Sequence, residues 1–458
     1  MKRIHPLVAL CYLIVAAGAS VSVVQAQGTP KIKFEKYTLP NGLEVILHED
    51  HSTPIVAVDT WYHVGSGDEQ VGRTGFAHLF EHIMFMGSQH VPVGAFDQML
   101  EAAGADNNGS TTEDRTNYYE TLPSNALPLA LWLDSDRMGF LLPTMDLAKV
   151  NLQRDVVKNE RRQRVDNQPY GRADEVILAA LYPKSHPYSW PVIGSMTDLS
   201  AASLTDVQNF FKTYYAPNNA VLAIAGDFDP TRTMALVQQY FGDIPRVPQP
   251  PKPDLTEPRQ TTERRVAKVD SLATRPALAI GYHMPPRNTP EYYAMGLIDQ
   301  ILLQGKDSRL YQSLVQQHGL TGDVSGGINL LGNMFDYDGP MLWIADLFHD
   351  PQVSTDSILR VFDATVEQLR TTPVDQATLD RALTKTRSSF YDIIEGSGGL
   401  GRADLLASFA LFDNDPGEIN RLESQFAKVT PALIQQTAQE YLRPSNRTVL
   451  TIETKKGS

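Results

Sequence analysis

The chain has 458 residues, enough for about two to four ordinary domains with substantial cores. Hydrophobic residues make up 42% of the sequence and charged residues 20%, a composition typical of a globular protein. The formal net charge of −13 argues against nucleic acid as a partner, because binding to phosphates needs an excess of basic side chains.

Residues 1–26 are predicted to form a secretory signal peptide. Lys2 and Arg3 precede an apolar run from Leu7 through Val24, and small residues end the segment. An uncleaved membrane anchor is the alternative; after cleavage no stable anchor would remain, and we expect a periplasmic protein. The only cysteine, Cys11, lies in this segment, so the mature chain would depend on its core, and on metal, rather than on disulfides.

The remaining sequence shows an α+β pattern in two parts. Hydrophobic periodicity predicts strands at 32–39, 43–49, 55–64, 106–112, 116–122 and 220–225, and helices at 95–103, 126–140 and 147–165. Six of the fourteen residues from Pro245 to Pro258 are proline, which predicts a stiff linker at 245–260. We therefore predict domains at 27–244 and 261–458.

The second part repeats the plan of the first. Tyr62–His63 ends a strand in one part and Tyr282–His283 ends the comparable strand in the other, and residues 215–219 resemble residues 441–446. We predict two homologous domains, each an antiparallel sheet packed with helices. The helix near Gly296–Ile301, which corresponds to the histidine-bearing helix described next, has no histidine.

His78, Glu81 and His82 form an H-x-x-E-H run in an apolar stretch, with Thr74 and Gly87 as predicted helix caps about three turns apart. Residues four apart share one face of a helix, so both imidazoles can point at one site, with Glu81 beside it as a base. Burying these groups requires compensation, which zinc supplies. The run predicts one catalytic zinc per chain; a pair of satisfied core histidines is the alternative.

A catalytic zinc needs a third protein ligand and leaves one position for water. Glu160 is our candidate, on a predicted long helix whose Val156 and Val157 indicate an inward face. From the residues alone, an ordinary surface glutamate remains the alternative.

Residues 65–69 (Gly-Ser-Gly-Asp-Glu) and 74–87 resemble the pitrilysin, insulysin and mitochondrial processing peptidase family, the inverted zincin metallopeptidases. The resemblance implies that Glu160, in its Val-Val-x-x-Glu context, is the third zinc ligand. It also implies a clamshell-like half of an endopeptidase that encloses unstructured oligopeptides. Gln153 stands where the family has a glutamate, a departure that would alter the surroundings of the ligands.

The same resemblance extends to a predicted substrate-binding strand at residues 104–111. Asn108, Gly109 and Thr111 match the family's edge strand, which pairs with an extended peptide through main-chain hydrogen bonds. Tyr119 matches one member of the family's aromatic pair. A packing role is the alternative for this tyrosine.

Two family residues are missing from the second part. The resemblance places an arginine and a tyrosine, which contact substrate near zinc, at positions occupied here by Val315 and Gly322. Such groups hold the peptide and stabilise an oxyanion, so a chain without them carries half a site. We expect a homologous partner subunit to supply both. A homodimer or monomer that uses other groups, such as Tyr282, His283 or Arg309, is the alternative.

The sequence thus predicts a zinc-dependent endopeptidase that cleaves unstructured oligopeptides as the zinc-bearing subunit of a heterodimer. The alternative is a non-catalytic binding or assembly subunit with a residual or structural zinc site. Glu81 favours the enzyme, because a structural site needs no base beside its ligands.

Overall fold

The structure is a computed structural model that describes residues 31–330 and 334–455; the predicted signal segment lies outside the described residues. The strands are β1 (Glu35–Thr38), β2 (Glu44–Glu49), β3 (Ile55–Tyr62), β4 (Asp106–Thr111), β5 (Thr116–Pro123), β6 (Ala220–Gly226), β7 (Arg264–Asp270), β8 (Ala277–His283), β9 (Ser325–Ile328), β10 (Leu342–Phe348) and β11 (Arg447–Thr454). The helices are α1 (Phe76–Ile83), α2 (Ala95–Ala102), α3 (Leu127–Phe140), α4 (Leu147–Arg161), α5 (Ala173–Leu181), α6 (Met196–Ala201), α7 (Leu204–Tyr214), α8 (Pro230–Phe241), α9 (Pro290–Leu302), α10 (Thr355–Thr371), α11 (Gln376–Ile394), α12 (Leu400–Asp413), α13 (Leu422–Ala427) and α14 (Pro431–Tyr441).

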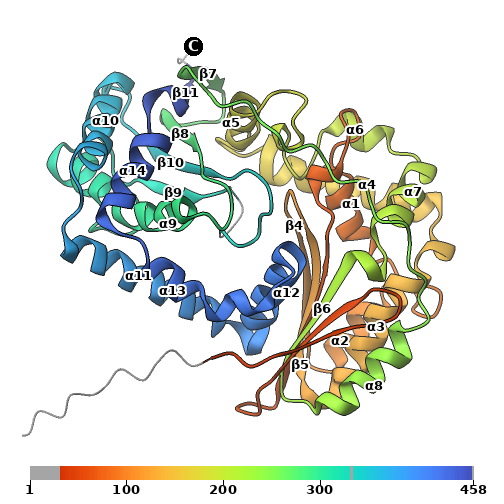
Figure 1. The fold of residues 1–458 in the computed structure, drawn as a ribbon. Helices are drawn as coiled ribbons and strands as arrows, with labels where there is room; N and C mark the ends of the chain where they lie inside the picture. Colours follow the sequence, from red (N-terminus) through yellow and green to blue (C-terminus); the bar gives the residue numbers. More distant parts are fainter. Residues whose placement is uncertain (1–30, 331–333, 456–458) are drawn as a thin grey trace, which may run out of the picture. The chain divides into compact units, whose positions relative to one another are not determined.

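Two sheets, each packed with helices, confirm the predicted α+β fold (Figure 1). The first has the order β1-β2-β6-β3-β5-β4 and the second β7-β11-β8-β10-β9, so the second repeats the first from β2 onward. The predicted purely antiparallel arrangement needs one correction in each sheet. β2 runs parallel to β6, and β7 runs parallel to β11, because the last strand of each half returns between β2 and β3 or between β7 and β8.

The two halves also share a polar clamp between a strand and a helix. In each, a buried asparagine side chain donates to a histidine carbonyl at the end of β3 or β8 and to the carbonyl of the last residue of the preceding helix, α7 or α14. The bonds run from Asn219 to His63 and Tyr214 (3.1 and 2.9 Å) and from Asn446 to His283 and Tyr441 (3.0 and 2.8 Å). These asparagines belong to the repeated segments seen in the sequence. Their matching hydrogen bonds explain why an asparagine occupies the same place in both segments.

One helix of each half packs against the sheet of the other half. α5, from the first half, packs on β8 and β11, where its buried Ile177, Leu178 and Leu181 join one apolar cluster with Leu342 and Leu450. α12, from the second half, packs on β3 and β6. Residues 245–260, predicted as a linker, contain no helix or strand and connect the two halves.

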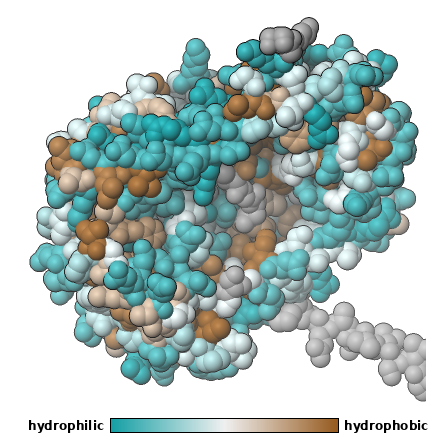
Figure 2. All heavy atoms as spheres, turned by 180° about the vertical axis from the view of Figure 1, so that it is seen from behind, coloured by the Kyte–Doolittle hydropathy of each residue, from teal (hydrophilic) through white to brown (hydrophobic). Residues whose placement is uncertain are grey.

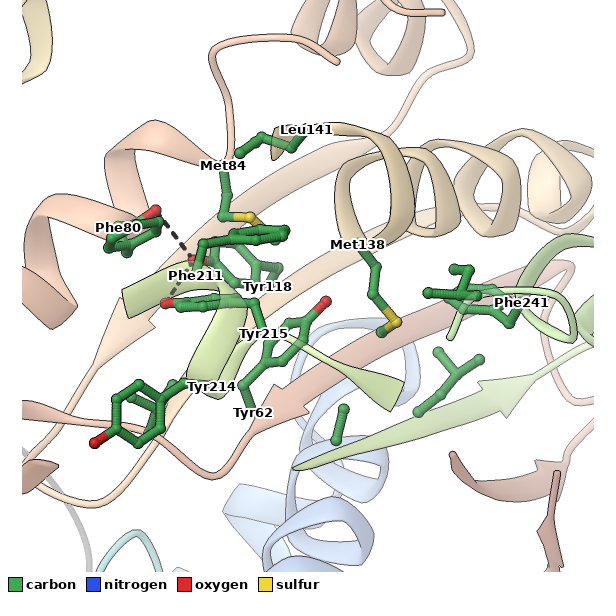
Figure 3. Close-up of a cluster of buried hydrophobic side chains, with 14 of the residues drawn as sticks. Tyr62, Phe80, Met84, Tyr118, Met138, Leu141, Phe211, Tyr214, Tyr215 and Phe241 are labelled. Atoms are coloured by element: carbon green, nitrogen blue, oxygen red, sulfur yellow. Dashed lines mark hydrogen bonds between the residues drawn. The ribbon is translucent and has the colours of Figure 1, made fainter. Parts of the chain in front are cut away.

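The first half's largest core lies beneath α1 and on one face of its sheet. Aromatic side chains from α1, β5 and α7 converge there, as Figure 3 shows for Phe80, Tyr118 and Phe211. The Tyr118 hydroxyl donates to the Phe80 carbonyl (3.3 Å) and contacts the Tyr215 hydroxyl (3.5 Å), so the burial of these polar atoms is compensated. This core fixes the height of α1 above the sheet.

Polar side chains cover most of the face shown in Figure 2, as the composition predicts. Among the described residues, no helix is both long and apolar enough to cross a membrane.

Acidic side chains are buried where α12 meets the first sheet. Asp59 of β3 and Asp404 of α12 are in hydrogen-bonding contact, and the Asn117 amide donates to both (3.1 and 3.5 Å). Nearby, Arg115 lies 3.6 Å from Asp336. Burial raises the pKa of Asp59 to about 7 and that of Asp404 well above its usual range, and the charges of Asp336 and Asp59 add to the effect on Asp404. Burial therefore favours the protonated form of Asp404.

Replacing this acid should change how stability depends on pH. A carboxyl group whose pKa is raised by folding stabilises the protein at low pH and loses that contribution as pH rises from the unfolded toward the folded pKa, which is about 7 for Asp59. We expect Asp404→Asn, which keeps a hydrogen-bond donor, to reduce the fall in unfolding free energy between about pH 4 and pH 7 by up to about 1.4 kcal/mol per pH unit. Urea unfolding at several pH values measures this, with the exposed Asp392→Asn as control. Equal slopes in all three proteins would contradict it.

Candidate metal centre

The first turn of α1 is held by a buried carboxylate from the preceding loop. Glu69 accepts hydrogen bonds from the backbone N–H groups of Gly75 (2.9 Å) and Ala77 (2.8 Å), which have no partner inside the helix. This corrects the predicted Thr74 cap: the N-cap is Gly75, at φ 88°, and the Thr74 hydroxyl instead donates to Asp198 (2.6 Å). Burial raises the pKa of Glu69 to about 8.

The end of α1 also differs from the prediction. The helix stops at Ile83 rather than running to Gly87, so it has eight residues and about two turns. The chain then tightens through bonds from the Phe85 and Met86 N–H groups to the carbonyls of residues three earlier, before Gly87 takes φ 73°. His78 and His82 still lie on one face, with ring centroids 4.9 Å apart.

The structure brings both histidines together with Glu160 of α4. The Glu160 Oε2 atom lies 3.2 Å from His82 Nε2 and 3.7 Å from His78 Nε2. Ligand atoms about 2.0–2.1 Å from a tetrahedral zinc are about 3.4 Å apart, so these separations fit one zinc ion. Among the described residues, this is the one group of three or more histidine, cysteine or acidic side chains placed to hold a metal.

The protonation states of these groups also suit a metal. Burial lowers the pKa of His78, which favours the neutral imidazole that binds metals. The pKa of Glu160 is lowered, chiefly by its hydrogen bond with His82, so this group is an anionic carboxylate. Two neutral nitrogens and one carboxylate form the ligand set of a catalytic rather than a structural zinc site.

Glu160 lies at the end of α4, where the helix changes its winding. A π-helical turn, Arg162–Asp166, follows directly, although the sequence had predicted one continuous helix to residue 165. Arg161 secures the junction by donating to the Gly194 carbonyl (2.7 Å) and pairing with Glu175. The turn carries Arg164, whose guanidinium lies 2.9 Å from Oε1 of Glu160, on the side away from the histidines.

The candidate base, Glu81, is held against the edge strand β4. The Thr111 hydroxyl donates to Glu81 Oε2 (2.6 Å), which fixes the carboxylate beside the histidines. Gly109 allows this approach, because a Cβ there would lie only 3.1 Å from Glu81 Cγ. Two predicted substrate-binding residues therefore also contact the base.

The other residues singled out in the sequence lie farther from the ligands. Asn108 is exposed on β4 and its side-chain oxygen accepts from the Gly109 N–H (2.9 Å). Tyr119 is half-buried on β5 and does not line the metal cavity. Gln153, in place of the family glutamate, contacts Met86 Sδ (2.6 Å).

A cavity of about 330 Å³ opens beside the ligands and is lined by residues from α1, β4, α4 and α5. It contains acidic groups that sequence reasoning did not single out: Glu113, Asp174 and Glu175. Asp174 and Glu175 are neighbours on α5, but both are far in the sequence from Glu113 and from the histidines, so no local spacing could have indicated them. The positions that lack the family's arginine and tyrosine do not line it: Val315 lies on a π-helical turn, Tyr311–Gln317, and Gly322 is exposed.

Comparison with known proteins identifies the family. The model of the family described as Insulinase (Peptidase family M16) matches residues 44–190, and that of the Peptidase M16 inactive domain matches residues 201–386. The chain belongs to the M16 peptidase family. The metal ligands fall within the first match, whereas the histidine-free repeat falls within the second, so the family assignment agrees with the asymmetry between the halves.

Relatives in the M16 family are zinc proteases. Zinc protease PqqE of Helicobacter pylori is 28% identical over 424 residues, which cover 92% of this chain and 93% of that protein. An uncharacterized zinc protease of Mycobacterium bovis is 30% identical over 297 residues, 65% of this chain and 67% of that protein. A crystal structure of a protease from Helicobacter pylori superposes with a TM-score of 0.85 at 26% identity, over 93% of this chain and all (100%) of that one.

Zinc should stabilise the chain through these three ligands. At a free concentration about 100 times the dissociation constant, a ligand of the folded state adds about 2.7 kcal/mol, so the melting temperature should rise. We expect His82→Ala to abolish the rise and the exposed His318→Ala to leave it intact. Thermal unfolding with and without zinc, together with the bound zinc per chain, tests this. An equal rise in both variants would place the zinc elsewhere.

Proposed function

We propose that this chain is a zinc-dependent endopeptidase acting on unstructured oligopeptides. The supporting observation is that two imidazoles and a carboxylate, spaced for one zinc, lie next to a glutamate held against an open sheet edge. A structural zinc site, as in a binding or assembly subunit, would not need that glutamate. The zinc proteases among the relatives support the same reaction.

His78, His82 and Glu160 would hold zinc, which when bound supplies a Lewis acid that acidifies water and polarises a carbonyl. Glu81 accepts the proton of the attacking water at its carboxylate and passes that proton to the leaving amine. Thr111 leaves one oxygen of Glu81 free for this exchange, because its hydroxyl occupies only Oε2. The residue thus serves as base and then acid without moving.

The substrate class follows from the strand beside the base. β4 ends its sheet, so among the described residues its outer edge has no partner strand and is open to an extended peptide. Pairing along this edge uses main-chain groups, which favours unfolded peptides and tolerates varied side chains. The signal-like sequence of residues 1–26 supports export, so we place this activity in the periplasm.

We further propose that the complete site needs a homologous subunit. In the part of the chain that the structure describes, the metal cavity has Arg164 as its one arginine and has no tyrosine. Arg164 is engaged with Glu160 and its side chain is 77% exposed, so it is poorly placed to hold an oxyanion. A partner with an arginine and a tyrosine at the positions that match Val315 and Gly322 would complete the site.

Glu81→Gln should abolish peptide cleavage without loss of zinc. Removing a positioned base and acid costs about 100-fold or more in rate, whereas the ligands remain untouched. Cleavage of a fluorogenic peptide library and the zinc content of each protein provide the two measurements. Glu101→Gln, an exposed glutamate on α2, is the matched control. Equal cleavage by the Glu81 variant would rule out this mechanism.

The isolated chain should cleave peptides slowly and gain at least about 100-fold in rate when a homologous chain carrying the arginine and tyrosine is added. The comparison needs the same peptide library and zinc-loaded protein in both arms, with a partner lacking both residues as control. Full activity of the isolated chain would disprove the split site while leaving the zinc mechanism standing.

A further inference from the structure

A second cavity lies in the C-terminal half, where the first half has its metal centre. It has a volume of about 490 Å³ and lies between α9, α11 and the edge strand β9. Gly296, Asp299 and Gln300 of α9 line it with the same spacing, three and four residues, as His78, Glu81 and His82 on α1. α9 follows β8 as α1 follows β3, so this cavity is the counterpart of the metal centre without its histidines.

The two cavities adjoin each other. Asp174 and Leu330 line both, so a peptide at the metal centre lies next to the second cavity. Asp174 comes from α5, the helix that the first half lends to the second sheet. A side chain of the peptide can therefore enter the second cavity while its backbone stays on β4.

The second cavity is acidic. Asp174, Asp299 and Asp346 line it, and its described lining contains no lysine or arginine. Lys385, the nearby cation, is turned away: its ammonium donates to the backbone carbonyls of Gln300 (3.3 Å) and Gln304 and pairs with Asp307.

The three carboxylates are not equally available to a ligand. Asp299 accepts a hydrogen bond from the Trp343 indole (2.8 Å), whereas among the described residues Asp174 and Asp346 form neither an ion pair nor a side-chain hydrogen bond. Burial, together with the charge of Asp174, raises the pKa of Asp346 to about 7. Charged carboxylates that lack a cationic partner in a partly buried cavity cost free energy, and a bound cation would offset that cost.

Two other polar atoms in the lining also lack partners. The Asn329 side-chain N–H₂ and the Thr386 hydroxyl are buried and make no hydrogen bond in the part of the chain that the structure describes. The apolar walls, formed by Phe335, Phe390 and Phe426, suit the aliphatic stem of a long side chain. The carboxylates, the Thr386 hydroxyl as an acceptor and these walls match a long chain that ends in a positive charge, whereas the Asn329 N–H₂ can donate only to an acceptor such as a peptide carbonyl.

We propose that this second cavity binds the lysine or arginine side chain of a peptide substrate held at the adjacent metal centre. The inference rests on the proposed peptidase function, and it adds a preference that backbone pairing on β4 cannot provide. The charged end meets Asp346 and Asp174, and the stem packs on the phenylalanines.

Equilibrium binding tests this without requiring cleavage. Short N-acetylated, fluorescein-labelled peptides of glycine, alanine and serine, each with one lysine, arginine or norleucine, are titrated with the zinc-loaded Glu81→Gln chain and followed by anisotropy. We expect the lysine and arginine peptides to bind about tenfold more tightly than the norleucine peptide. Acetylation removes the terminal amine, so the preference reports the side chain.

The same titrations in Asp346→Asn and Asp174→Asn should bring the three peptides to similar affinity, while Asp392→Asn, an exposed aspartate on α11 outside the cavity, keeps the preference. Asp174 is exposed, so its variant tests the proposal even if Asp346→Asn fails to fold. Equal binding of all peptides to the parent chain would overturn the inference alone, as would a preference that survives both substitutions. Absence of any peptide binding would overturn the proposed function as well.

Discussion

The metal centre depends on how closely α4 approaches α1. A zinc site tolerates only a few tenths of an ångström in the separation of its ligand atoms, yet Glu160 is far from the histidines in the sequence. Three restraints set the distance. The aromatic core fixes α1 above the sheet, Glu69 holds the first turn of that helix, and Arg161 fastens the end of α4 to the Gly194 carbonyl.

These restraints also determine how solvent and peptide can reach the site. α1 packs against α4 and the edge strand β4, and a cavity lined by His78 and Glu160 opens beside them. Glu81 lies between the histidines and strand β4, where the Thr111 hydroxyl donates a hydrogen bond to its carboxylate. The candidate metal ligands, the candidate base and strand β4 are thus held against one another, with the winding change after Glu160 as the least regular element.

Local sequence patterns predicted the helix that carries both histidines, the edge strand and the repeat of the whole plan. They did so because periodicity and short motifs report on neighbours in the chain. Val156 and Val157 indicated an inward face on the helix of Glu160, but only the family resemblance distinguished this residue from an ordinary surface glutamate. The Glu69 cap, the acidic second cavity and the parallel strand pairs depend on contacts between distant segments, which periodicity does not record. Thr74 was predicted as a cap from its residue type, but Gly75 leaves room for the backbone of residues 193–194, and the threonine turns to Asp198.

The exchange of α5 and α12 has a consequence for the chain as a whole. A separated first half would expose Ile177, Leu178 and Leu181 to water, and its own sheet would lose the helix that covers β3 and β6. Neither half is thus a self-sufficient folding unit, even though each has a complete sheet. A half-length polypeptide with this architecture could bury these surfaces only by exchanging helices with a second molecule. In this chain the proline-rich segment connects the two halves, so the same exchange of helices takes place within one molecule.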